Sequence, residues 1–255
     1  MEKLSGLPVP QVRYFDTTGS TNAEALDWAA SGAEDGCLVI ADQQTQGRGR
    51  LGRRWITQPG SALAFSLILR PGKEEAQHLG LFTALGALAV SQALEDSLRL
   101  RSAIKWPNDV LLQGRKCAGI LAEADWSGER LDGVVIGIGI NIGASAVPPA
   151  EALLYPATSV EEAAGQEVDR LEMLRAVIEA LFAWRKQMGN PSFLEAWQLR
   201  LAFLGVWVQI QESAEGSKRI IGQISGLAAD GSLLLRDEAG QTLTISTGDV
   251  HLRPV

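Results

Sequence analysis

The 255-residue sequence has only two cysteines and two histidines. With so few thiols and imidazoles, and no close cluster of them with carboxylates, we expect no dedicated zinc site. Cys37 and Cys117 each lie in an apolar, strand-like stretch, which favours two buried thiols over a disulfide. Unpaired thiols are typical of a reducing compartment, so we expect a cytoplasmic protein.

The sequence also lacks long apolar runs and an excess of positive charge. The first sixteen residues contain no apolar core of signal-peptide length. The most apolar later stretch, residues 79–94, is interrupted by polar residues and glycine and is too short for a membrane span of about 20 residues. The net charge of −7 argues against a general nucleic-acid binder. We therefore expect neither a membrane nor a DNA partner.

Up to residue 203 the apolar pattern changes between strand-like and helix-like periods. A helix is predicted from Thr21 to Gly32, with Thr21 and Glu24 as a capping box and the glycine as the stop. Further helices are predicted over residues 74–98, 170–188 and 193–201. Strands are predicted over residues 36–42, 62–70, 103–106, 109–112, 115–124 and 133–143. This pattern predicts an α/β (α+β) domain with a central mixed sheet flanked by helices.

From residue 204 onward the pattern consists of five short strands. Turns are predicted at Glu215-Gly216, Asp230-Gly231 and Ala239-Gly240. Five strands in so short a stretch predict a small C-terminal SH3-like β-barrel that packs on the larger domain.

Residues 47–55, GRGRLGRRW, combine three glycines with four arginines. Glycine permits close backbone approaches that side chains would block, and guanidinium groups suit phosphate or carboxylate. Neither the Walker nor the dinucleotide fingerprint is present. The segment is therefore either a loop that wraps an anionic ligand or a solvated basic turn.

Two further segments combine a lysine with other polar groups. Residues 105–109, KWPND, place a cation, an amide and a carboxylate around a proline, which also suits an ordinary turn. Lys116 stands in a strand whose neighbours are mostly apolar. It is either a surface lysine at a strand edge or a lysine aimed into a pocket, where it would stabilise negative charge.

Two short motifs have both a structural and a functional interpretation. Residues 20–22, Ser-Thr-Asn, suit the start of a helix. The glycines in residues 137–141, GIGIN, lie inside a predicted strand. They mark either a bulge or a backbone that runs close to a ligand or to another strand.

Taken together and in this order, the motifs resemble the biotin protein ligase family. They are STN (20–22), QQTQGRGRLGRRW (43–55), KWPNDVLL (105–112), RKCAGILAE (115–123) and GIGINI (137–142). The likeness extends from Phe15 to Val255. It implies a catalytic domain over 1–203 and an SH3-like domain over 204–255. It also implies two reactions: activation of biotin with ATP to biotinyl-5'-AMP, and transfer of biotin to a lysine of a biotin carboxyl carrier domain of the acetyl-CoA carboxylase type.

The resemblance also implies roles for individual residues. Biotin would be bound by Ser20, Thr21, Asn22, Gln44, Arg48, Gly49, Arg50 and Lys116. The nucleotide would be bound by Arg48, Arg50, Arg53, Trp55, Lys105, Asn108 and Asn141, with Trp106 helping to cover the adenylate. The catalytic residues would be Lys116, Asp109 and Arg50. Lys116 would hold the biotin carboxylate and neutralise charge on the phosphate, and Asp109 would deprotonate or orient the carrier lysine. Magnesium is implied as the partner of ATP, without an identified protein ligand.

Three other functions compete with this interpretation. Relatives that repress transcription carry a winged helix-turn-helix before the STN motif, and here 19 residues precede Ser20. Lipoate ligases and octanoyltransferases usually carry an R-R-x-x-G-G-G segment followed by a His-Asp pair, and neither is present here. A non-catalytic biotin-binding protein, or a protein-interaction module built on the C-terminal barrel, would need neither the arginines nor Lys116. Relatives often form homodimers through the central sheet, an expectation without direct support in this sequence.

Overall fold

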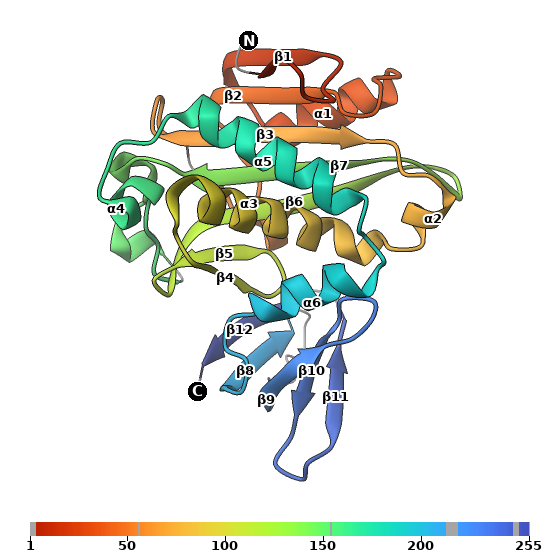
Figure 1. Ribbon diagram of the computed structural model, residues 1–255, viewed down its shortest axis with the longest axis vertical. Coiled ribbons are helices and arrows are strands. Elements are labelled where there is room, and N and C mark those ends of the chain that lie inside the picture. Colours follow the sequence, from red (N-terminus) through yellow and green to blue (C-terminus); the bar gives the residue numbers. More distant parts are fainter. Residues whose placement is uncertain (1–3, 56, 154, 213–218, 247–249, 255) are drawn as a thin grey trace.

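A seven-stranded sheet forms the centre of the larger part of the molecule (Figure 1). The computed structural model describes residues 4–55, 57–153, 155–212, 219–246 and 250–254. The strands of this sheet are β1 (Val12–Thr18), β2 (Leu38–Gln44), β3 (Ala62–Leu69), β4 (Ser102–Lys105), β5 (Asp109–Leu112), β6 (Arg115–Ser127) and β7 (Arg130–Asn141). Their spatial order is β1-β2-β3-β7-β6-β5-β4. Only β1 and β2 pair in parallel, and the other neighbours are antiparallel, which confirms the predicted mixed sheet.

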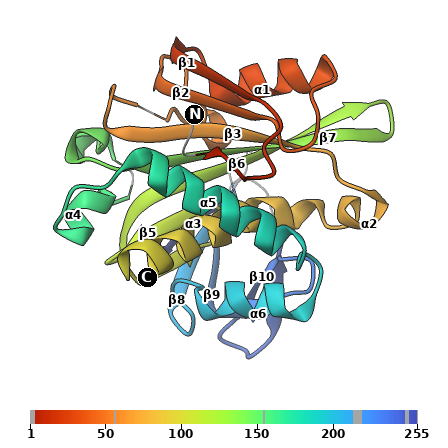
Figure 2. The ribbon, with the colours of Figure 1, turned by 45° about the horizontal axis from the view of Figure 1, so that its top comes forward.

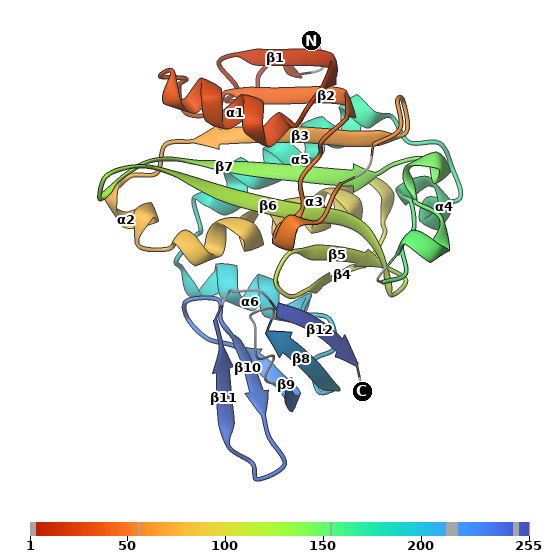
Figure 3. The ribbon, with the colours of Figure 1, turned by 180° about the vertical axis from the view of Figure 1, so that it is seen from behind.

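Helices cover the two faces of this sheet unequally. The long helices α3 (Phe82–Leu98) and α5 (Arg170–Arg185) pack together across one face (Figures 1 and 2). Helix α1 (Thr21–Ala30) lies on the opposite face, beside the segment that follows β2 (Figure 3). The shorter helices are α2 (Lys73–Ala76), α4 (Val160–Ala164) and α6 (Pro191–Leu199). The face that carries α1 is therefore the one with room for a site.

The alternation of side chains along β7 explains why the two faces differ. Ile136, Ile138 and Ile140 all belong to the main hydrophobic core, which the long helices share. Since successive side chains of a strand point to opposite faces, the glycines between these isoleucines face the side of α1. Gly86 brings α3 close to the sheet, because a Cβ there would lie 2.9 Å from Cγ2 of Ile120.

A second sheet packs against this body. Its strands are β8 (Trp207–Glu212), β9 (Arg219–Leu227), β10 (Leu233–Arg236), β11 (Thr242–Ile245) and β12 (Val250–Pro254). They form an antiparallel sheet in the order β11-β10-β9-β8-β12. Trp106 joins the two parts: it is 1% exposed, and its indole Nε1 donates to the carbonyl of Gly231 at 3.1 Å. The main core continues into the second sheet, so the boundary between residues 203 and 204 stays a proposal.

Two of the local expectations differ from the structure, and a third lies outside the described residues. The helix predicted over 74–98 is wrong as one piece: α2 and α3 are separated by a 3-10 turn, η3 (Leu79–Leu81). Arg185 holds Glu75 of α2 through bonds of 2.7 and 3.0 Å, and the glycine within η3 weakens a continuous helix. Trp106 lies in the core, so the expectation that it covers an adenylate is wrong. The turn predicted at residues 215–216 lies outside the described residues.

The predicted capping box at Thr21 is also wrong. Ser20 is the N-cap of α1, and its side chain makes no cap hydrogen bond. The carboxylate of Glu24 accepts instead from Oγ1 of Thr18 at 2.7 Å. The N–H and the hydroxyl of Thr21 both bond to Gln44, on β2, so a long-range contact replaces the local box.

Both cysteines are buried and unpaired, as predicted. Burial raises the pKa of the Cys117 thiol to about 12, so this thiol stays protonated at neutral pH. In the described part of the chain, no helix has the length and apolar character that crossing a membrane requires.

The close contact at Gly86 generates a stability prediction. Gly86→Val should lower the free energy of unfolding by about 1–3 kcal/mol, because the added atoms press on Ile120 and Ile136 in a packed core. Urea unfolding measures this change. Gly72→Val is the control, since a Cβ at Gly72 meets nothing within 4 Å. Equal stability of the two variants would contradict the close packing of α3.

Candidate active site

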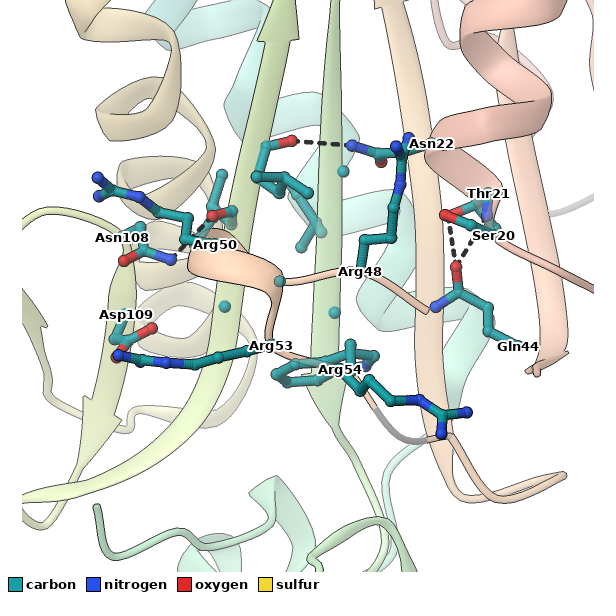
Figure 4. A pocket seen from close by; sticks show the side chains of 18 of the residues that line it. Ser20, Thr21, Asn22, Gln44, Arg48, Arg50, Arg53, Arg54, Asn108 and Asp109 are labelled. Carbon is teal, nitrogen blue, oxygen red and sulfur yellow. Dashed lines mark hydrogen bonds between the residues drawn. The ribbon is translucent and has the colours of Figure 1, made fainter. Parts of the chain in front are cut away.

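A cavity opens on the face of the sheet that carries α1. The segment after β2 crosses in front of β6 and β7 and forms one wall (Figure 3). The start of α1, the end of β2 and the turn before β5 form the others, and the strands form the floor (Figure 4). The cavity measures about 700 Å³ when the space open to solvent is counted. The lining residues are Ser20, Thr21, Asn22, Gln44, Arg48, Gly49, Arg50, Arg53, Arg54, Trp55, Asn108, Asp109, Lys116, Gly119, Ile120, Leu121, Gly137, Ile138 and Gly139.

All the predicted site residues except Lys105, Trp106 and Asn141 line this cavity. Lys105 instead places its ammonium 4.1 Å from the centre of the Tyr155 ring. Asn141 is 4% exposed and donates from Nδ2 to the carbonyl of Thr158 at 3.2 Å. The structure therefore brings together residues from five motifs that are far apart in the chain, and it leaves Lys105 and Asn141 beside the cavity.

The start of α1 is tied to β2 by a polar cluster. Oε1 of Gln44 accepts from the N–H of Thr21 at 2.8 Å and from its hydroxyl at 3.1 Å. Oγ of Ser66, on β3, lies 2.8 Å from Oγ1 of Thr21 and 2.6 Å from Oδ1 of Asn22. Because the oxygen of Gln44 is occupied, its amide nitrogen is the group that remains for a ligand. Figure 4 shows this nitrogen on the cavity side.

Asn22 is held from three directions. Its Nδ2 donates to the carbonyl of Leu121 at 3.2 Å and to Oε2 of Glu123 at 2.7 Å. Its Oδ1 accepts from Ser66, so the amide has a defined orientation. Both amide hydrogens of Asn22 are used within the protein, and a direct role in biotin binding stays a prediction.

The glycines of β7 leave the space that Asn22 and Trp55 occupy against the sheet. A Cβ at Gly137 would lie 1.9 Å from Oδ1 of Asn22, and a Cβ at Gly139 would lie 2.3 Å from Cε2 of Trp55. No side chain larger than hydrogen fits at either position without displacing its neighbour. The strand pairs without a bulge at these residues, so the bulge interpretation of GIGIN is wrong. The close neighbours are side chains from α1 and from the arginine-rich segment, and an approach to a ligand stays a prediction.

Residues 47–55, called here the arginine loop, fold back on themselves. The N–H of Gly49 donates to the carbonyl of Arg53, and the N–H of Trp55 to that of Gly47, each at 2.8 Å. Leu51 has a φ of +63°, a left-handed conformation that side chains rarely adopt. Figure 4 shows Arg48 and Arg53 extending in different directions from this loop, Arg48 beside Asn22 and Arg53 toward Asp109.

Lys116 points into the cavity and pairs with Asp109. Its Nζ lies 2.5 Å from Oδ1 of Asp109 and 5.7 Å from the centre of the Trp55 ring. Its side chain is 25% exposed and that of Asp109 is 13% exposed. The interpretation of Lys116 as a surface lysine is therefore wrong, and the pocket interpretation holds.

The backbone of Lys116 is fixed as firmly as its side chain. Its N–H donates to the carbonyl of Pro156 at 2.8 Å, and its carbonyl accepts from the N–H of Thr158 at 2.9 Å. Asn141 holds the same segment through the carbonyl of Thr158. Asn141 therefore supports the strand that carries Lys116.

The electrostatics of the cavity favour an anion. Five cationic side chains line it, and Asp109 is the one carboxylate among the lining residues (Arg48, Arg50, Arg53, Arg54 and Lys116 are the cations). Guanidinium groups bind phosphate and carboxylate with two parallel hydrogen bonds. The hydroxyls of Ser20 and Thr21 and the amide of Gln44 line the side of α1 and β2, which Arg48 borders (Figure 4). This side is called here the neutral polar end, and the side of Lys116 and Asp109 is called the cationic end.

Sequence and structure comparisons agree with this geometry. Residues 14–141 match the Biotin/lipoate A/B protein ligase family. The Biotin--[acetyl-CoA-carboxylase] ligase of Paracoccus denitrificans is 39% identical over 230 residues, which are 88% of this chain and 93% of that protein. The chain therefore belongs to the biotin/lipoate A/B protein ligase family, and within it to the biotin protein ligases.

Two further comparisons set the extent of the likeness. The structure of the biotin protein ligase from Aquifex aeolicus in complex with biotin and ATP superimposes with a TM-score of 0.81 and 32% identity, over 96% of this chain and 100% of that one. The bifunctional ligase/repressor BirA of Bacillus subtilis is 40% identical over 165 residues, which are 65% of this chain. That match spans 50% of the Bacillus protein, about half its length.

Sequence reasoning missed several residues that shape the site. Arg54, Gly119 and Leu121 line the cavity, and Ser66 and Glu123 hold the residues that line it. All but Ser66 lie inside the quoted motifs, which is the signal that could have pointed to them. Ser66 lies in an apolar strand, and a lone buried serine there carries no local signal.

The contact between Gly139 and Trp55 generates a prediction for the loop. Gly139→Ala should push Trp55 off the sheet at a cost of about 1–3 kcal/mol and open the arginine loop to trypsin, with cleavage roughly tenfold faster if cleavage follows local opening. Timed proteolysis with mass spectrometry measures this. Ile136→Val is the control, because Ile136 belongs to the main core and is not among the residues that line the cavity. Equal cleavage of Gly139→Ala and the wild type would contradict the glycine's role.

Proposed function

We propose that this chain is an ATP-dependent, AMP-forming biotin–[biotin carboxyl carrier protein] ligase. It converts biotin and ATP to biotinyl-5'-AMP and pyrophosphate, and then transfers biotin to a specific lysine of a carrier domain of the acetyl-CoA carboxylase type. The observation that carries the proposal is the convergence of Lys116, Asp109 and the arginine loop on one cavity whose other end is neutral and polar. A relative with 32% identity is described in complex with biotin and ATP.

Biotin binds with its ring system at the neutral polar end. A small, mostly apolar ligand needs only a few well-placed donors and acceptors. Ser20, Thr21 and the amide nitrogen of Gln44 supply them. The indole Nε1 of Trp55 is buried and has no hydrogen-bond partner among the described residues, so it is a further donor that a ligand can use. Gly137 and Gly139 let Asn22 and Trp55 lie close against the floor, which leaves the space above them for the ligand.

In the first reaction an oxygen of the biotin carboxylate attacks the α-phosphorus of ATP. The new O–P bond forms as the bond from this phosphorus to the bridging oxygen breaks, and pyrophosphate leaves with both bonding electrons. Lys116 holds the attacking carboxylate in line and neutralises charge that develops at the phosphate. Arg48 and Arg50 lie over biotin and the adenylate and stabilise the same negative charge. Arg53 stabilises the charge of the departing pyrophosphate.

In the second reaction the amine of the carrier lysine attacks the carbonyl carbon of the mixed anhydride. A C–N bond forms, the bond from this carbon to the phosphate oxygen breaks, and AMP leaves. The attacking ammonium must first lose a proton. Asp109 can orient it or accept that proton once Lys116 has turned from Asp109 toward the phosphate. The 2.5 Å separation of Lys116 and Asp109 supports the proposal that they act as a pair.

Some of the residues predicted to bind the nucleotide line the cavity, and others do not. Trp55, Asn108 and the arginines line the cavity. Nδ2 of Asn108 donates to the carbonyl of Ile120 at 3.0 Å, so a ligand would meet its oxygen. Lys105 and Asn141 lie beside the cavity, and no direct contact with the nucleotide is proposed for either.

Magnesium accompanies ATP in this proposal as the partner of its phosphates. The described residues contain no group of three or more His, Cys, Asp or Glu side chains that could hold a metal ion. In the cavity lining the one carboxylate, that of Asp109, is paired with Lys116. The described residues therefore offer no ready-made cluster of three metal ligands, and no step is assigned to a protein-bound metal.

Pyrophosphate exchange into ATP tests the activation reaction. We expect exchange with biotin and none with lipoate, octanoate or no acid. Lys116→Met should reduce exchange about 100-fold or more, because a donor that stabilises transition-state charge is worth about 3 kcal/mol. Lys73→Met, on α2, is the control. No exchange by folded protein with any acid would leave a non-catalytic binding protein as the better account.

Salt dependence tests how the carrier is recognised. We expect the cationic edge of the cavity to attract an acidic face of the carrier, because rim charges mainly raise association rates. The kcat/KM for the carrier should then fall severalfold between about 0.05 and about 0.3 M salt, where screening shortens the reach of surface charges. Pyrophosphate exchange under the same conditions corrects for effects on activation. A kcat/KM that does not change with salt would contradict this recognition.

A further inference from the structure

Glu123 connects two walls of the cavity. It lies on β6 beyond Gly119 and Leu121, on the same face of the sheet. Its Oε2 accepts from Nδ2 of Asn22 at 2.7 Å and from Nη2 of Arg48 at 3.1 Å. One carboxylate oxygen thus joins the start of α1 to the arginine loop.

The contact with Asn22 belongs to a rigid part of the site. Asn22 also bonds to the carbonyl of Leu121 and to the hydroxyl of Ser66, and Gly137 leaves room for it against the sheet. Asn22 is 4% exposed. The position of the Glu123 carboxylate is therefore set by the sheet and by α1.

The contact with Arg48 belongs to a part of the site that carries concentrated positive charge. Four arginines lie within seven positions of the loop, and like charges so close together repel one another. Arg48 is 43% exposed and Glu123 is 27% exposed. The pair is open to solvent, so its attraction is the modest one of a surface ion pair. Glu123 therefore opposes the repulsion at the point where the loop reaches the sheet.

We propose that Glu123 is a positioning residue that acts through Arg48, holding the arginine loop over the biotin end of the cavity before any anionic ligand arrives. This inference rests on the proposed function. The role of Glu123 concerns closure over biotin, because its carboxylate contacts the loop and α1 and does not contact Lys116. Its loss should therefore weaken the retention of biotin more than the chemistry of activation.

The first test is Glu123→Gln, which has nearly the same shape. Its amide oxygen can still accept from Asn22, but the negative charge that attracts Arg48 is gone. In pyrophosphate exchange we expect the KM for biotin to rise up to about fivefold, equivalent to about 1 kcal/mol, with kcat unchanged. Glu179→Gln is the matched control: Glu179 pairs with Arg175 at 2.9 Å on the exposed side of α5. An unchanged KM in folded Glu123→Gln would overturn the proposal.

The second test is a double-mutant cycle with Arg48→Gln. If Glu123 acts through Arg48, then Glu123→Gln should have no further effect on the KM for biotin in a protein that already carries Arg48→Gln. Two effects that multiply would show that Glu123 acts by another route, and would overturn the proposal. Should Glu123→Gln fail to fold, Glu123→Asp takes its place in the cycle, because it keeps the charge but shortens its reach.

The third measurement does not depend on activity. Amide hydrogen exchange of the ligand-free protein reports on the loop through the N–H groups of Gly49, Arg53 and Trp55, each bonded within the loop. Their exchange should be faster in Glu123→Gln than in the wild type and unchanged in Glu179→Gln. Absence of biotin-dependent activity in the wild type would count against the proposed function, whereas unchanged loop exchange would count against the role of Glu123 alone.

Discussion

The site depends on a strip of sheet without side chains. At Gly137 and Gly139 in β7, the amide of Asn22 and the ring of Trp55 occupy the space that a Cβ would need. These contacts bring α1 and the arginine loop onto the same floor. If the strip carried methyl groups, both walls would move outward and the cationic end would separate from the neutral polar end. Ile136, Ile138 and Ile140, which alternate with these glycines, face the other way and anchor the strand in the main core.

Several cationic side chains lie close together above this floor, and they repel one another as long as no anionic ligand is bound. Two carboxylates pair with cations of the cavity: Asp109, which lines it, and Glu123, which is not among the lining residues. Asp109 pairs with Lys116 at the strand end of the cavity, and Glu123 pairs with Arg48 at the helix end. Each ion pair fixes a cation near the place where the ligand's charge would lie. A ligand carboxylate or phosphate then replaces or joins an existing partner, and no unpaired charge has to be buried.

The sequence predicted the mixed sheet, the small second sheet and nearly all of the cavity lining, because the motifs carry the residues that meet there. What it could not predict depends on contacts between distant positions. Glu123 and Arg48 are 75 positions apart, and Glu123 and Asn22 are 101 apart, so no local pattern joins them. The capping box failed for the same reason: Gln44, 23 positions away, takes the hydroxyl of Thr21. Trp106 is next in sequence to the polar residues of the KWPND motif, but its side chain is buried against the second sheet.

Lys116 and Arg48 are held in different ways, and the difference fits their proposed tasks. The backbone of Lys116 is bonded to β5 on one side and to residues 156 and 158 on the other, so the strand sets where its ammonium can reach. Arg48 belongs to a loop that Trp55 packs against β7 at Gly139, and its own side chain is held to β6 by Oε2 of Glu123. A group that aligns reacting atoms gains from a fixed backbone, because small displacements are costly in rate. A group that closes over a ligand must also release it, and an ion pair that is 43% and 27% exposed is weak enough to allow both.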